Sequence, residues 1–187
     1  LSEMTRGGKN IFWPLLWRGR VNLDADRLEE AQRDLSRALR LRPDNAWAWG
    51  LLGALCLKRG RLDGASAALR QARRGKTHAW IEALRGEAAA RLGRADEASS
   101  LFDRALRLDT GADLARLGRL RLRELRGDMT GALEDVELAL KADGASAGLF
   151  LRRGRILMSL GRMSDAEADA SSALAIHGQY AEAFYLR

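Results

Sequence analysis

Small residues recur along this chain at an almost constant interval. Five alanines are separated by 34, 33, 34 and 34 residues, and five more follow them at a distance of seven residues. The two series are Ala31, Ala65, Ala98, Ala132 and Ala166, and Ala38, Ala72, Ala105, Ala139 and Ala173. A period of this length is typical of helical repeat proteins, in which each unit buries its apolar face on its neighbours.

Glycines form two further series with the same period. One lies in the first half of each unit, at Gly19, Gly53, Gly86, Gly118 and Gly154. The other marks a turn, at Gly60, Gly93, Gly127 and Gly161, and Asp26 takes its place in the first unit. Turn glycines suit the left-handed conformation that ends a helix. Alanine and leucine dominate and only two prolines occur, so each unit is predicted to be a helix, a turn and a second helix.

The stretch from Trp49 to Ala72 connects this pattern to a known family. Trp49-x2-Leu52-Gly53-x2-Cys56 resembles the first half of a tetratricopeptide (TPR) repeat, with cysteine where the family usually has tyrosine. Ala65-x3-Leu69 and Ala72 resemble the second half, with leucine for the usual phenylalanine. The resemblance implies an all-α, right-handed α-solenoid of antiparallel helix-turn-helix repeats. It also implies that the first helices of successive units line a concave surface.

The spacing predicts the organisation of the whole chain. Residues 1–11 are expected to form an irregular lead-in to a single solenoid over 12–187. The expected repeats are 12–45, 46–78, 79–112, 113–146 and 147–180, and a partial repeat or cap follows at 181–187. The chain begins at Leu1 rather than methionine and stops at Arg187 within an apparent helix, so we interpret it as a piece of a longer protein.

Unit four departs from the pattern, because Gly118 lies nine residues before Gly127 where the other units have seven. Counting back from Gly127 would bury three arginines, which is costly for unpaired charges. Counting from Gly118 instead buries Leu114 and Leu117 and turns the arginines outward. We expect the second alignment, with two extra residues before the turn.

A net charge of +7 permits several classes of partner. Acidic peptides, nucleic acid and anionic membrane surfaces are all compatible with it, and it selects none of them. Cys56 is the single cysteine, so no intrachain disulfide can form. A reducing, cytoplasmic compartment is therefore favoured.

Three tryptophans occupy one position in successive first helices. Trp13, Trp47 and Trp80 are separated by 34 and 33 residues, so the family resemblance places them along one edge of the concave groove. Indoles offer apolar area and one N–H donor each, as peptide-binding hot spots do. Alternatively, each of them packs on the preceding unit, which is the commoner role of aromatics at helical spacing. Trp17 and Trp49 are expected to be structural.

An arginine stripe is the second candidate site. Arg116, Arg119 and Arg123 share one helical face, and Arg152 and Arg155 can join them from the next first helix. Such a surface suits carboxylate-rich peptides or phosphate. The alternative is a solvated charged face that neighbouring acids neutralise. An RNA site is weaker, because it needs aromatics interleaved with the positive track.

No motif for catalysis, cofactor or metal binding is present in the sequence. Neither histidine has a cysteine or histidine partner at ligand spacing, and the Gly-Arg turns lack a phosphate-loop sequence. Cys56 is expected to be a small buried hydrophobe. The lysine–asparagine clamp of chaperone-binding TPR domains is not matched either, since no asparagine lies in the first helices of units two to five.

The sequence therefore predicts a non-enzymatic scaffold or adaptor that binds a peptide segment or a partner domain in its concave groove. Two alternatives remain open. The chain could be the docking arm of a larger enzyme whose catalytic domain lies outside it, or it could bind RNA or an anionic surface through the arginine stripe. Self-association through the end repeats is a further possibility.

Overall fold

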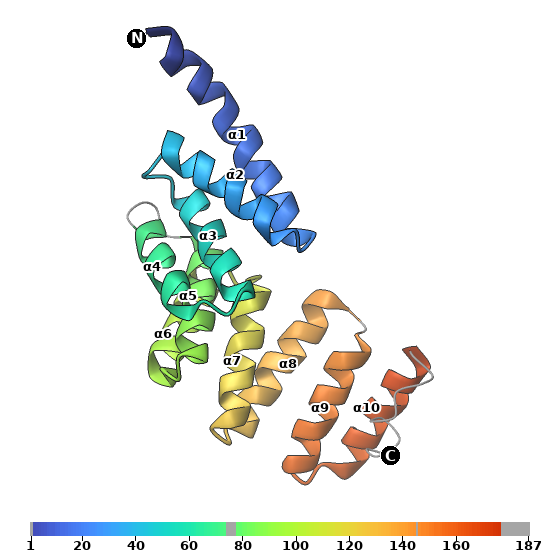
Figure 1. Ribbon diagram of the computed structural model, residues 1–187. Helices are drawn as coiled ribbons and strands as arrows, with labels where there is room; N and C mark the ends of the chain where they lie inside the picture. The colour runs from blue at the N-terminus through green and yellow to red at the C-terminus, as the bar shows by residue number, and fades with distance from the viewer. Residues whose placement is uncertain (1, 74–77, 145, 177–187) are drawn as a thin grey trace. The chain divides into compact units, whose positions relative to one another are not determined.

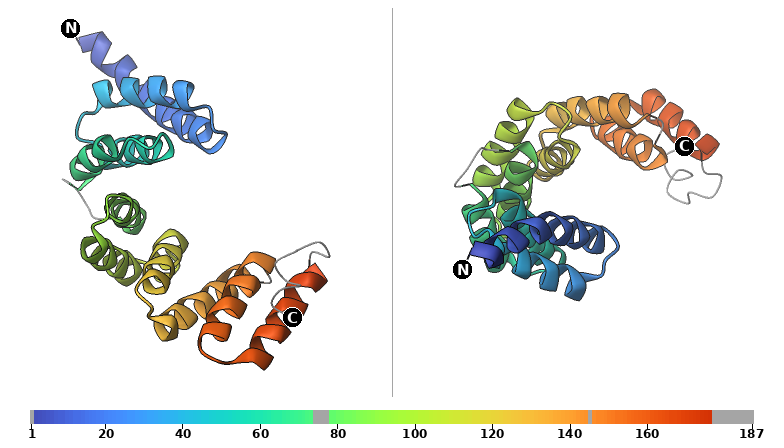
Figure 2. Two further views of the ribbon diagram at one scale, coloured as in Figure 1. Left: turned by 60° about the horizontal axis from the view of Figure 1, so that its bottom comes forward. Right: turned by 90° about the horizontal axis from the view of Figure 1, so that it is seen from above.

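The computed structural model describes residues 2–73, 78–144 and 146–176, and these form ten α-helices with no strand among them. In chain order the helices are α1 (Ser2–Asp24), α2 (Leu28–Leu41), α3 (Ala46–Lys58), α4 (Leu62–Ala72), α5 (Ala79–Arg91), α6 (Ala95–Leu108), α7 (Asp113–Leu125), α8 (Met129–Asp143), α9 (Ala147–Ser159) and α10 (Met163–Ile176). Consecutive helices pair as antiparallel hairpins (Figures 1 and 2). The predicted all-α repeat fold is confirmed.

Each hairpin turns through one residue in the left-handed conformation. Gly60, Gly93, Gly127 and Gly161 have φ between 69° and 76°, and Asp26 takes the same role at φ 58° in the first turn. A side chain at positive φ is disfavoured because its Cβ crowds the following carbonyl, so glycine is the usual residue here. The turn series in the sequence therefore corresponds directly to the hairpin turns.

The small residues of the period are the points where helices touch. A Cβ added to Gly53 of α3 would lie 2.5 Å from Leu69 Cγ of α4, which is closer than any real contact allows. Ala31, Ala65, Ala98 and Ala132 have no exposed surface and Ala166 only 1%. Glycine and alanine thus let the two helices of a hairpin approach until leucines fill the remaining space.

Residues cluster into two compact units, Leu1–Leu101 and Phe102–Arg187. In the first unit, one core cluster joins α1, α2 and α3. It includes Leu16 of α1, Leu35 of α2, and Leu51 and Leu55 of α3. In the second unit, Ile156 of α9 packs with the core of the α7–α8 hairpin. Within each unit, a first helix therefore buries one face on the preceding hairpin.

The N-terminal lead-in is a correction to the sequence prediction. Helix α1 begins at Ser2 and has 23 residues, whereas α3, α5, α7 and α9 have 13 each. Pro14 lies inside α1 rather than in its first turn. It occupies the exposed side of the helix, where water can satisfy the carbonyl that proline leaves without a donor. The predicted cap at 181–187 lies outside the described residues.

Unit four follows the other alignment, counted back from its turn glycine, so the expected insertion is wrong. Helix α7 has the same 13 residues as its counterparts, with no extra residues before Gly127. Leu120 takes the position of the helix-crossing glycines and is fully buried, whereas Leu114, predicted to be buried, is 43% exposed. Leu120 fits because the facing residue of α8 is Val136, which is smaller than its leucine and phenylalanine counterparts.

Gly118 has a different role from the other glycines of its series. A Cβ at this position would overlap the ring of Phe102, which belongs to α6 of the preceding hairpin. Gly118 thus makes room for the largest side chain that occurs at this second-helix position in the chain. Because of this local exchange of sizes, the glycine is two residues out of phase with the rest of its series.

Candidate functional site

Two of the three predicted tryptophans lie together in the first unit. The ring centroids of Trp47 and Trp80 are 5.2 Å apart, and His78 lies edge-on to Trp47 at 5.7 Å. Trp47 remains 36% exposed. Trp80 lies against Gly50 of the preceding hairpin, where a Cβ would overlap its six-membered ring. For Trp80, packing on the preceding unit therefore accounts for most of its contacts.

Trp13 belongs to a separate aromatic group. Its ring lies 5.1 Å from Phe12, and the Arg42 guanidinium carbon lies 5.7 Å from its centroid. The side chain is 47% exposed. Trp17, expected to be structural, is 55% exposed because it lies on the side of α1 away from α2. The structure thus brings Trp47 and Trp80 together and gives Trp13 different neighbours.

The predicted arginine stripe lies in the second unit, but it does not face outward. Arg116 is buried, and its guanidinium donates to Asp113 at 2.7 Å and to the carbonyl of Thr110. Arg119 Nη2 donates to Asp135 Oδ1 at 2.6 Å, and Arg119 Nη1 donates to Asp103 at 2.8 Å. The expectation of outward-facing arginines is wrong, because the facing helices supply the carboxylates that offset the cost of burial.

Asp135 is the centre of this network. It is fully buried and accepts hydrogen bonds from Arg119 Nε, Arg119 Nη2 and Arg123 Nη1 at 2.6–3.0 Å. Arg123 also donates to the carbonyl of Gly131 at 2.6 Å. The hydrogen bonds with Asp135 are the largest influence on Arg119 and raise the pKa of its guanidinium above the usual value. The network ties α7 to α8.

The same pair recurs in two other hairpins. Arg18 with Asp34, Arg119 with Asp135, and Arg153 with Asp169 are each separated by 16 residues and joined by two parallel N–H···O bonds. Hairpin two has Leu52 and Ala68 at these positions. The pairs lie in phase with the period of the chain, so the sequence contained the signal, but the prediction considered the arginines apart from their aspartates.

Arg152 and Arg155 both line a hollow of about 280 Å³ in the second unit. Its other lining residues are Glu124, Met129, Ile156 and Ser159. Arg152 is held there by Glu124, with Nη2 donating at 2.5 Å and Nε at 3.0 Å. These two predicted site residues are therefore neighbours in a partly polar depression. The hollow lies beside α9, one of the first helices.

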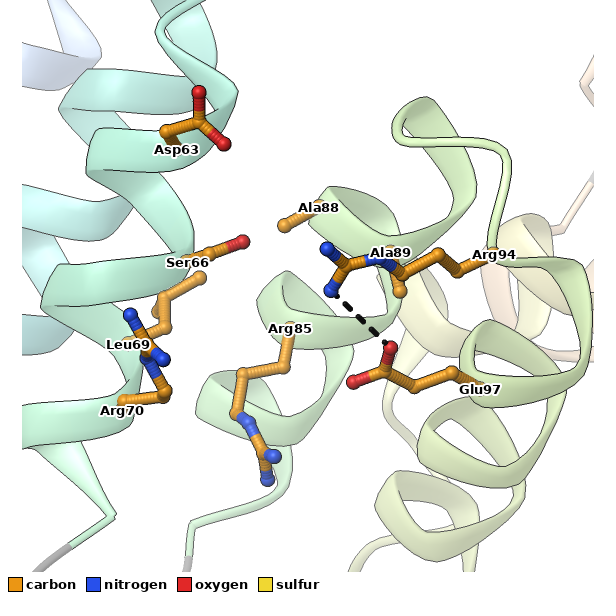
Figure 3. Close-up of a pocket in the computed structure, with 9 residues that line it drawn as sticks. All are labelled: Asp63, Ser66, Leu69, Arg70, Arg85, Ala88, Ala89, Arg94 and Glu97. Atoms are coloured by element: carbon orange, nitrogen blue, oxygen red, sulfur yellow. Dashed lines mark ion pairs between the residues drawn. The ribbon is translucent and has the colours of Figure 1, made fainter.

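A smaller hollow lies between α4, α5 and α6 in the first unit, as Figure 3 shows. Its volume is about 210 Å³. It is lined by Asp63, Ser66, Leu69, Arg70, Arg85, Ala88, Ala89, Arg94 and Glu97. Arg94 pairs with Glu97 at 3.6 Å, and Arg85 pairs with the buried Glu82 at 2.8 Å. Carboxylates and guanidiniums alternate here, so the hollow does not form a site of single charge.

The described side chains offer no evident reactive centre. Burial raises the pKa of the Cys56 thiol, which lowers the fraction of nucleophilic thiolate at neutral pH. The residues that could be searched include no group of three or more histidine, cysteine or acidic side chains able to hold a metal ion. Of the helices that the structure describes, none is long and apolar enough to cross a membrane.

The sequence-based prediction missed one exposed residue of the first helices. Leu114 of α7 follows Trp13, Trp47 and Trp80 at an interval of 34 residues and is 43% exposed. It was assigned to the core because unit four was aligned on Gly118. Alignment on the turn glycine gives it the same repeat position as the tryptophans, so an apolar side chain occupies this position in the first helices of four hairpins.

Helical hairpins of this period, closed by glycine turns and stacked through small residues, define a class of repeat protein. Two models of the tetratricopeptide repeat family match the chain, over residues 22–77 and 84–147. The chain belongs to the tetratricopeptide repeat family.

Solved structures with the same fold cover nearly the whole chain. The type IV pilus biogenesis factor PilW has a TM-score of 0.82 at 18% identity, covering 99% of this chain and 86% of its own. YrrB, described as a TPR protein with an unusual peptide-binding site, has a TM-score of 0.72 at 18% identity, covering 98% and 95%. A thermophilic TPR protein of Thermus thermophilus has a TM-score of 0.72 at 20% identity, covering 93% and 95%. Comparison with curated proteins gives no significant match.

Proposed function

We propose that this protein is a non-enzymatic scaffold or adaptor that binds a peptide segment or a partner domain on the surface of its first helices. Proteins of the TPR family are typically interaction modules without catalytic activity. The observation that supports the proposal most is Trp47, which is 36% exposed beside Trp80 and His78. An indole anchored by aromatic neighbours on one side and open on the other has the form of a binding hot spot.

The aromatic position is favoured over the arginine stripe as the anchor. Arg116, Arg119 and Arg123 make hydrogen bonds within their own unit, so a ligand would have to compete with Asp113 and Asp135 for their donors. We keep Arg152 and Arg155 as predicted electrostatic contacts because they line one hollow. YrrB, a structural neighbour, is described as having a peptide-binding site, which is in line with a peptide ligand here.

The proposal can be tested with peptides selected from a random display library on the immobilised protein. We expect enriched peptides whose affinity falls about tenfold or more for Trp47→Ala, because truncation of a hot-spot side chain typically costs about 2 kcal/mol or more. Trp17→Ala is the matched control, since Trp17 is an exposed indole on another surface. Equal binding to the wild type and the Trp47→Ala variant would contradict the proposal.

Salt dependence separates the aromatic anchor from the alternatives. Binding through the indole should change little between low and high salt, because apolar contacts are not screened. Binding to RNA or to anionic vesicles through the arginines would weaken steeply with salt. A ligand whose affinity falls steeply with salt and is unaffected by Trp47→Ala would favour the electrostatic alternative.

A further inference from the structure

The first helix carries an apolar stripe that no described part of the chain covers. Trp13, Trp17 and Val21 of α1 are spaced by four residues, so they lie on one helical face. They are 47%, 55% and 56% exposed. Three large apolar side chains in a row differ from scattered exposed hydrophobics, which need no explanation.

The repeat period shows that this face is a packing surface elsewhere in the chain. Trp17 and Val21 lie 34 residues before Leu51 and Leu55 of α3, which are 4% and 1% exposed in the core formed with α1 and α2. The positions equivalent to Val21 in α5, α7 and α9 are also buried, at Ala88, Leu122 and Ile156. Helix α1 therefore presents the face that the later first helices bury.

The shape of the stripe distinguishes its two ends. At one end lie the bulky side chains of Trp13 and Trp17. At the other end, a hollow of about 570 Å³ is lined by Val21 together with Asn22, Asp34, Glu30 and four arginines, namely Arg18, Arg27, Arg33 and Arg37. The stripe thus runs from a protruding end to a recessed end.

We propose that a second copy of this chain packs on the stripe, with the two α1 helices antiparallel and the two-fold axis at Trp17. This arrangement sets Trp13 of each copy over the Val21 hollow of the other, so protrusion meets recess twice. A contact of this kind uses one patch on both copies and closes into a dimer. An indole over the hollow would also lie beside arginines, whose guanidiniums stack favourably on aromatic faces.

The charges along the stripe are compatible with such a contact. Arg18 pairs with Asp34 at 2.6 Å, and Arg20 pairs with Asp24 at 2.8 Å, so both arginines of α1 are neutralised within their own copy. Like charges brought together by the two-fold axis therefore do not oppose association strongly. About half of each indole and of Val21 is available for burial, a few hundred Å² per copy. This is below the roughly 800 Å² per partner of a stable complex, so the dimer should dissociate in the micromolar range.

Sedimentation velocity over a series of protein concentrations tests the proposal. The wild-type chain should shift from monomer to dimer as concentration rises through the micromolar range, and Trp17→Glu with Val21→Glu should weaken association at least about tenfold. Ile11→Glu is the matched control, because Ile11 is 48% exposed on the same helix but about 120° around it from Trp17. A monomeric wild type, or equal association of all three proteins, would overturn the proposal.

A cross-linking experiment tests the two-fold geometry itself. In a Cys56→Ser background, Trp17→Cys should form a disulfide-linked dimer under mild oxidation, because the axis brings the two copies of this position together. Ile11→Cys should not. Head-to-tail stacking would give growing oligomers and no selective link at position 17, and would overturn the two-fold contact. The outcome is independent of peptide binding, since Trp47→Ala should leave the dimer unchanged.

Discussion

Replacement of Asp135 by alanine should be the most destabilising single change in the second unit's charge network. The carboxylate is fully buried and accepts three hydrogen bonds from Arg119 and Arg123. Removing one partner of a buried ion pair typically costs about 3–5 kcal/mol, since the other charge is left without compensation. Arg119 and Arg123 retain 20% and 25% side-chain exposure and other acceptors, which reduces the expected loss to about 2–3 kcal/mol.

The chain itself supplies the companion variant. Hairpin two has Leu52 and Ala68 where hairpin four has Arg119 and Asp135. Arg119→Leu combined with Asp135→Ala should therefore recover most of the lost stability, because an apolar pair can replace a buried ion pair at little cost. The double variant should lie within about 1 kcal/mol of the wild type, so the two substitutions are strongly non-additive.

Asp34→Ala is the control for this series. Asp34 is equally well paired, but its partner Arg18 is 62% exposed and can be solvated when the aspartate is removed. The expected loss is about 1 kcal/mol or less. Urea denaturation followed by circular dichroism measures all three variants. The reasoning is refuted if Asp135→Ala costs no more than Asp34→Ala, or if the double variant is less stable than Asp135→Ala alone.

Individual contacts elsewhere in the chain support three more predictions. Hydrogen bonds from Arg18 hold the pKa of Asp34 below its usual value, so its stabilising contribution is present above about pH 4 and lost as pH falls through the folded-state pKa; acid titration of the Asp34→Asn variant should show a smaller loss of stability than the wild type. Since burial raises the pKa of Cys56, maleimide labelling at neutral pH should be slower than for a free thiol and should reach the free-thiol rate on unfolding. Gly50→Ala should destabilise the first unit by about 1–3 kcal/mol in thermal denaturation, because the added methyl group displaces the Trp80 ring, and an unchanged or raised melting temperature would contradict this packing.

Much of the fold could be predicted because the constraints are local and repeated. A turn residue at positive φ and a small residue at a helix crossing each restrict one position, and five units repeat the restriction. Helices α3, α5, α7 and α9 accordingly begin at Ala46, Ala79, Asp113 and Ala147, the residues at which the sequence-based repeats begin. The period fixed those positions without any knowledge of long-range contacts.

The failures arose where two positions depend on each other. Gly118 accommodates Phe102 from another hairpin, and Leu120 is tolerated because Val136 is small, so neither residue alone indicates the alignment. The arginines of α7 were turned outward because their burial was judged without the aspartates of the facing helices. Fidelity to the repeat phase, applied to aspartates as well as alanines, would have corrected both errors.

The candidate site could be predicted only as a repeat position. The phase of Trp13, Trp47 and Trp80 identified a shared place in the first helices, but it could not tell which side chains the neighbouring hairpins cover. Gly50 lets Trp80 pack inward, whereas Trp47 keeps an open side. Exposure depends on the size of a residue one hairpin away, which spacing alone does not report.

The most direct measurement uses the five tryptophan indole N–H signals in a two-dimensional ¹H–¹⁵N NMR spectrum, with each signal assigned by single substitution. Addition of a library-selected peptide should shift the signals of Trp47 and Trp80 and leave that of Trp17 unchanged. If the peptide binds while the Trp47 and Trp80 signals remain in place, the first-helix surface around Trp47 is not the binding site.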